Sequence, residues 1–143
     1  MSESVLNAVA DAVVESLNQA TFSLSFAAAR HYQPKFELKE MNELHVSVVP
    51  RGIVEKRISR SLTAFDCGID IGVQQRVGTE KAQLDALSNL VTEIRDHVRD
   101  VKLPEYPRSP VIELMIDPVF APEHLDELRQ FTSVVRVTYR AWQ

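Results

Sequence analysis

The 143-residue chain lacks several features that would narrow its function at once. It has one cysteine, Cys67, so no disulfide can form within the chain, and it has no cluster of Cys and His at zinc-ligand spacing. Its four glycines form no GxGxxG or GxxxxGK[ST] loop and no GxSxG elbow. We therefore predict that the chain is not an enzyme and has no catalytic residues, no cofactor and no metal site.

Positive charge and long apolar runs are also scarce. The net charge is −4 and the pI is about 5.6, which argues against a general nucleic-acid-binding protein. No apolar run approaches the roughly 18–20 residues that cross a bilayer. Residues 1–16 lack the basic region of a signal peptide. We expect a soluble protein of a cytosol-like compartment with no membrane partner, folded as a single domain over residues 1–143.

The most regular pattern is the segment FDCGIDIGVQQRV, residues 65–77, which we call the spine. Apolar and polar residues alternate along it, and only Gln75 interrupts the apolar set. Because successive side chains of a strand point to opposite faces, this pattern predicts a long strand with one apolar and one polar face. Cys67 falls on the apolar face, where we expect a small buried hydrophobe. The polar face carries Asp66, Asp70, Gln74 and Arg76.

Similar patterns predict the other elements. Apolar residues at spacings of three and four predict helices, and alternation predicts strands. We expect helices at 3–19, capped by Ser2 or Ser4, and at 79–101, capped by Thr79. We expect strands at 22–28, 44–48, 65–77, 111–116 and 131–142, a turn at 50–52, an edge strand near 35–38 and helical turns at 122–128.

The resulting order is α-β-β-β-α-β-β. Consecutive strands favour hairpins, so the sheet of about five strands should be mixed and mostly antiparallel. Two helices with one-sided apolar stripes would cover one face, which makes the fold class α+β, a two-layer sandwich. The segment around residues 49–61 has little apolar content and is expected to project as a hairpin.

Four cations concentrate in this hairpin segment: Arg51, Lys56, Arg57 and Arg60. One interpretation is a solvated hairpin flank with Glu55 as an internal partner. The other is a contact surface for an acidic protein or for a phosphate backbone. Few aromatic residues accompany the cations, which disfavours base stacking.

The sequence gives little evidence for catalytic groups. Asp66 and Asp70 share a strand face but lie about 13 Å apart by the strand rise, too far to act on one bond. The pattern favours ion pairs with Arg76 and Arg140 instead. None of the four histidines has a second ligand at metal-binding spacing, so we expect surface histidines.

Two stretches resemble the tail terminator (tail-completion) proteins of long-tailed bacteriophages. The first is the spine followed by KAQLDALSNLVTEI, and the second is DPVFAPEHLDELRQFTSVVRVTYRAW. With LHVSVVPRG upstream, the resemblance covers about residues 44–142. None of these stretches is a catalytic motif.

The resemblance implies a structural virion protein of the tail–neck region, made in the host cytoplasm. Such a protein forms a homohexameric ring that caps the tail tube, ends its polymerisation and joins the head–tail connector or stopper protein. DNA passes through the central hole without sequence-specific binding. The projecting hairpin and the polar face of the spine would then be subunit contacts or lumen lining, and the basic hairpin could pair with the acidic first helix of a neighbouring subunit.

Two alternatives stay open. The chain could be another neck component, such as a head-completion or stopper protein. It could also be a small nucleic-acid-binding α/β module that uses the basic hairpin, which predicts binding with a steep salt dependence.

Overall fold

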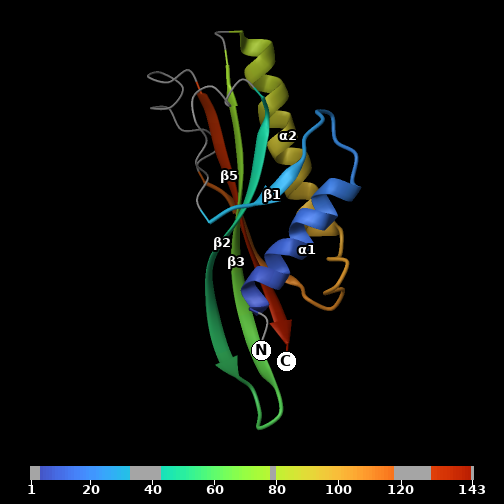
Figure 1. The fold of residues 1–143 in the computed structure, drawn as a ribbon, viewed down its shortest axis with the longest axis vertical. Helices are drawn as coiled ribbons and strands as arrows, with labels where there is room; N and C mark the ends of the chain where they lie inside the picture. The colour runs from blue at the N-terminus through green and yellow to red at the C-terminus, as the bar shows by residue number, and fades with distance from the viewer. Residues whose placement is uncertain (1–3, 33–42, 78–79, 118–129, 143) are drawn as a thin grey trace.

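The computed structural model describes residues 4–32, 43–77, 80–117 and 130–142. Two helices and five strands follow in the order α-β-β-β-α-β-β, which confirms the α+β prediction. Figure 1 shows the elongated molecule, with the chain coloured from blue to red. The elements are α1 (Val5–Gln19), β1 (Ala28–Arg30), β2 (His45–Arg57), β3 (Thr63–Arg76), α2 (Lys81–Asp100), β4 (Val111–Ile116) and β5 (Gln130–Trp142).

The five strands form one sheet in the order β1-β2-β3-β5-β4. Only β1 and β2 run parallel, and the other neighbours are antiparallel, so the sheet is mixed and mostly antiparallel as predicted. The spine is β3, which pairs with β2 on one side and with β5 on the other. It therefore lies at the centre of the sheet.

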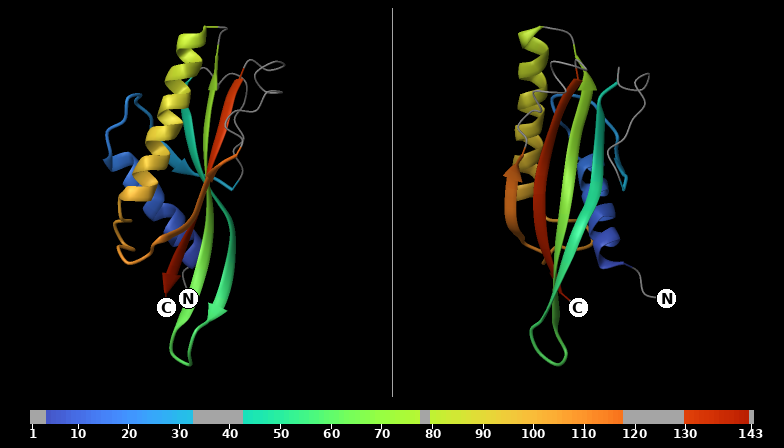
Figure 2. Two further views of the ribbon diagram at one scale, coloured as in Figure 1. Left: turned by 180° about the vertical axis from the view of Figure 1, so that it is seen from behind. Right: turned by 90° about the vertical axis from the view of Figure 1, so that its left-hand side faces the viewer.

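Both helices lie on one side of the sheet, as the two views of Figure 2 show. α1 packs over β1, β2 and β3, and α2 packs over β5 and β4. The core lies between these layers. Its buried side chains come from the apolar stripes of the helices and the apolar face of the sheet; they include Val9, Val13, Leu17, Val46, Val48, Ile69, Ile71, Leu87, Leu90, Ile94, Val135, Val137 and Tyr139.

The helix ends differ in how they are capped. Ser4 caps α1, and its side-chain oxygen accepts a hydrogen bond from the backbone N–H of Asn7 at 3.3 Å, which confirms one of the two predicted caps. α2 begins at Lys81 with Glu80 at the N-cap position and no side-chain capping bond. The predicted cap at Thr79 is therefore wrong by one residue, and Thr79 itself lies outside the described residues.

The predicted strand at 22–28 is mostly wrong, because β1 begins only at Ala28. Phe22, Leu24 and Phe26 are half-buried while the serines between them are exposed, so the alternation is real. However, residues 22–27 form no ladder with any strand of the described part of the chain. The backbone N–H of Ser23 instead donates to the Glu93 carboxylate at 3.0 Å. Alternating burial indicates an extended backbone, but the segment is a strand only if its backbone forms hydrogen bonds with a neighbouring strand.

The predicted turn at 50–52 is also wrong. β2 continues to Arg57, and the register with β3 shifts between Pro50 and Gly52, so Arg51 is the extra residue of a β-bulge. Proline is tolerated at bulges and on edge strands. β1 covers β2 only up to Val48, so Pro50 lies where β2 has no further neighbour on that side among the described residues.

β2 and β3 meet in a closed turn. The backbone N–H groups of Ile58 and Ser59 donate to the carbonyl of Leu62 at 3.0 and 3.1 Å. This hairpin extends beyond the helices at the lower end of the molecule (Figure 1). The predicted edge strand near 35–38, the helical turns at 122–128, and Ser2 lie outside the described residues.

Candidate assembly surface

The face of the sheet opposite the helices carries ion pairs that cross the strands. Asp66 on β3 accepts two hydrogen bonds from the guanidinium of Arg140 on β5, at 2.7 and 3.1 Å. The ammonium of Lys56 on β2 lies 3.3 Å from the same carboxylate. The hydrogen bonds from Arg140, and after them those from Lys56, hold the pKa of Asp66 below its ordinary value. One carboxylate thus joins three strands.

A second ion pair lies further along the same face. The guanidinium of Arg51, which the bulge places here, pairs with Asp70 and reaches the hydroxyl of Thr138 at 3.5 Å. It lies directly over Gly68, where an added Cβ would come within 2.5 Å of the Arg51 Nη2. The Arg51 guanidinium can therefore occupy this position only because Gly68 has no side chain.

The polar residues predicted from the spine do not form one site. Asp66 and Asp70 are each neutralised by cations of the same chain, and Gln74 and Arg76 lie at the other end of β3. Gln74 is buried, and its Oε1 has no hydrogen-bond partner among the described residues, like the buried Oγ of Ser47 on β2. Buried oxygens normally have a hydrogen-bond partner, either a protein group or an ordered water.

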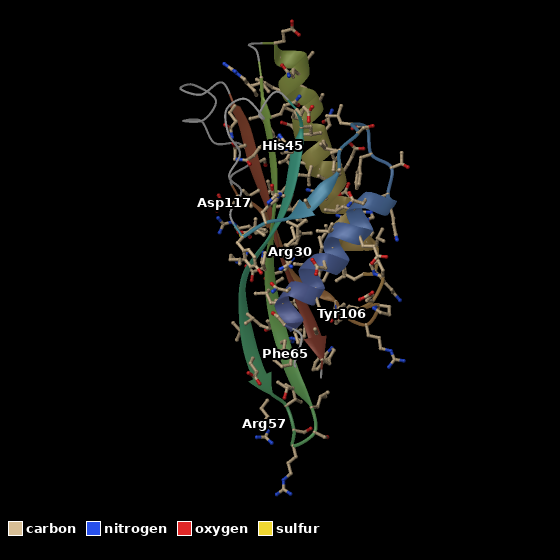
Figure 3. The ribbon with its side chains drawn as sticks, in the orientation of Figure 1. Arg30, His45, Arg57, Phe65, Tyr106 and Asp117 are labelled. Atoms are coloured by element: carbon tan, nitrogen blue, oxygen red, sulfur yellow. The ribbon has the colours of Figure 1, made fainter. Side chains whose placement is uncertain are left out.

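The predicted basic cluster also separates into two groups. Arg51 and Lys56 are paired with Asp70 and Asp66, so their charge is largely used within the chain. Arg57 lies at the distal end of β2 (Figure 3), and Arg60 lies in the turn between β2 and β3. Neither makes an ion pair among the described residues. Of the four cations of the predicted cluster, Arg57 and Arg60 are the two that offer unpaired positive charge to a partner.

The same distal region exposes apolar side chains. Among the described residues, four of the nine exposed large hydrophobic side chains lie within residues 53–62. Val54 and Ile58 are 56% and 57% exposed, and Ile53 and Leu62 accompany them. Apolar side chains gathered on an exposed hairpin are typical of a protein-contact surface. Sequence reasoning found the cations here but not this apolar component.

The acidic first helix is less available than the sequence indicates. Asp11 on α1 is already paired with Arg30 on β1 at 2.8 Å, and Glu15 accepts a hydrogen bond from Gln19 at 3.1 Å. The described part of the helix therefore offers one carboxylate, Glu15, that is not ion-paired.

His31, His45 and His97 are half-buried, so each reaches the surface with part of its side chain, and His124 lies outside the described residues. His97 on α2 shares a 2.8 Å hydrogen bond with the hydroxyl of Ser16 on α1 and meets the ring of Phe22 edge-on. Burial lowers the pKa of His97. This contact links the two helices, and it could not be predicted because Ser16 and His97 are 81 positions apart.

Cys67 is fully buried, as predicted, and burial raises the pKa of its thiol to about 11. In the described ranges, no group of three or more His, Cys, Asp or Glu side chains could hold a metal ion. None of the helices in those ranges is long and apolar enough to span a membrane. A scan against protein-family models and a search of curated proteins each find no match to this chain.

Proposed function

We propose that the chain is a structural protein of a bacteriophage tail, which assembles into a homohexameric ring at the end of the tail tube. The ring ends tube polymerisation and offers a surface to the head–tail connector or stopper protein. The observation that carries the assembly part of this proposal is the distal hairpin, with exposed Val54 and Ile58 beside the uncommitted cations Arg57 and Arg60. The resemblance to tail terminator proteins supplies the phage context.

The hairpin supports an assembly role because its conformation is fixed while its surface is exposed. Strand pairing continues to Arg57 opposite Thr63, and two hydrogen bonds to Leu62 close the turn. A rigid arm loses little conformational entropy when it binds, so it suits a repeated contact between subunits. Its exposed apolar side chains gain free energy when a partner covers them.

The polar face of the sheet supports a lumen in which DNA moves without being held. Arg51, Lys56 and Arg140 lie on this face, and Asp66 and Asp70 offset two of these three positive charges. A surface with few uncommitted cations releases few counterions when phosphate approaches, so it binds DNA weakly. The same pairing counts against the nucleic-acid-binding alternative, because two of the four hairpin cations are committed.

Native mass spectrometry of the purified chain, alone and with tail-tube protein, tests the proposal. We expect a hexamer, either alone or on the tube. The variant with Arg57→Glu and Arg60→Glu should form it less well, because the reversed charges would repel an acidic partner surface. A wild-type chain that stays monomeric in both samples would refute the assembly role.

Electron microscopy of phage lacking this gene separates the tail terminator from the other neck proteins. Overlong tails would support a terminator. Filled heads that lose their DNA would instead support a head-completion or stopper protein.

A further inference from the structure

The sheet has two edges that no described strand covers. β1 pairs with β2 only at Val46 to Val48, and the backbone N–H of His31 extends this contact by one bond, to the carbonyl of Val48. Beyond that point, residues 49–57 form one free edge among the described residues. β4, whose only described neighbour is β5, forms the other edge, on the opposite side of the sheet (Figure 2, right).

Both edges carry exposed apolar side chains. Ile53 and Val54 lie on the β2 edge, at 44% and 56% exposure. Ile112 and Met115 lie on the β4 edge, each at 43% exposure. An uncovered edge with exposed apolar side chains is a template for pairing with another strand, because its unpaired N–H and C=O groups can continue the ladder.

The two edges differ in the sign of their uncommitted charge. At the β2 edge this charge is net positive, because Arg57 at the strand end and Arg60 in the turn outweigh the exposed carboxylate of Glu55. At the β4 edge it is negative, from Glu113 within the strand and Asp117 directly after it, both exposed. None of these five side chains makes an ion pair with another described residue.

These signs select the partner edge. Two β2 edges would bring two surfaces of net positive charge together, and two β4 edges would bring two negative surfaces together. Like charges on neighbouring strands are destabilising. A β2 edge against a β4 edge brings opposite charges together. Charged residues on an edge thus oppose pairing with a copy of the same edge but favour pairing with the other one.

We propose that the β2 edge of one copy pairs with the β4 edge of a second copy, so that the sheet continues from subunit to subunit. This inference rests on the proposed assembly, and it identifies the surface through which neighbouring subunits contact each other. Because every copy has one edge of each kind on opposite sides, the contact repeats head to tail. A head-to-tail contact of this type forms a closed ring when the rotation between neighbouring subunits divides a full turn into a whole number of steps.

Two charge-reversed variants test the pairing. The basic-edge variant carries Arg57→Glu and Arg60→Glu, and the acidic-edge variant carries Glu113→Arg and Asp117→Arg. Each variant alone presents two edges of the same sign, and we expect its assembly midpoint to rise more than about tenfold in concentration. An equimolar mixture restores both contacts if the variants alternate, so native mass spectrometry should detect rings that contain equal numbers of the two.

Glu15→Arg on α1 serves as the matched control, because it reverses an exposed charge away from both edges. We expect it to assemble like the wild type. All variants should melt within a few degrees of the wild type, since the changed side chains are exposed and hold no internal ion pair. Hydrogen exchange gives a second readout: residues 51–57 and 111–116 should exchange more slowly in the assembly than in the monomeric variants.

The outcomes separate this inference from the proposed function. If the wild type assembles but the edge variants assemble equally well, or their mixture stays monomeric, the edge pairing is wrong and the assembly role remains. Loss of assembly in Glu15→Arg alone would assign the contact to α1 and also overturn the edge pairing. If the wild type is monomeric alone and with tail-tube protein, the proposed function is wrong.

Discussion

Replacing Asp66 by asparagine removes the negative charge that holds Arg140 and Lys56 on the polar face of the sheet. The Asp66 side chain is 9% exposed, and its two hydrogen bonds from Arg140 are charge-assisted. Hydrogen bonds to charged groups contribute about 1.5–3 kcal/mol, but both cations keep much of their surface in water, which screens the interaction. We therefore expect Asp66→Asn to lower the free energy of unfolding by about 1–2 kcal/mol.

Urea unfolding at pH 7 measures this loss, and thermal melting should show a decrease of roughly 3–8 °C for a domain of this size. Asp100→Asn is the matched control, because Asp100 pairs with Arg99 at the exposed end of α2. We expect that variant to unfold like the wild type. In a double-mutant cycle, Arg140→Gln should account for most of the Asp66→Asn loss, because the two residues share the same interaction.

The pH dependence provides a second test of the same interaction. The folded-state pKa of Asp66 is lowered from 3.8, mainly by the hydrogen bonds from Arg140. Between the lowered value and 3.8 the unfolded chain binds more protons than the folded chain. The stabilisation is therefore complete above 3.8 and is lost as the pH falls through the folded-state pKa. A difference between wild type and Asp66→Asn that is absent at pH 7, or unchanged at pH 2, would refute the reasoning.

Three further predictions concern the rest of the fold. Gly68→Ala should displace the Arg51 guanidinium and cost about 1 kcal/mol in urea unfolding, whereas Gly52→Ala, where a Cβ meets nothing within 4 Å, should cost nothing. Burial lowers the pKa of His97 from 6.5, so the folded chain binds fewer protons at this residue than the unfolded chain does. The free energy of unfolding should therefore fall as the pH drops below 6.5. His97→Gln should remove this dependence in urea unfolding measured between pH 7 and 5. Cys67, buried with a pKa of about 11, should react with a thiol reagent only as fast as the chain opens, and rapid labelling of the folded protein would contradict its burial.

The sequence was most informative where a pattern was long. The spine shows a sustained alternation, and the apolar stripe of α2 continues over five turns, so both were predicted within one or two residues of their bounds. The alternation also predicted the polar face of β3, which carries Asp66 and Asp70. Local patterns of this kind need no knowledge of distant neighbours.

The errors arose where a neighbouring element decides the outcome. Residues 22–27 alternate but have no partner strand among the residues that the structure describes. Residues 50–52 have turn-forming composition but remain within β2 because β3 continues to pair with it. Likewise, the sequence shows that Arg51 and Lys56 are basic, but only the cross-strand register reveals that Asp70 and Asp66 neutralise them. The free edge of β4 depends on the strand order, which alternation does not specify.

The central claim is that this chain assembles through its sheet with further copies of itself. Native mass spectrometry of the basic-edge variant, the acidic-edge variant and their equimolar mixture tests this claim most directly. The account predicts monomers for each variant alone and rings with equal numbers of both in the mixture. A mixture that remains monomeric under conditions in which the wild type forms rings would contradict it.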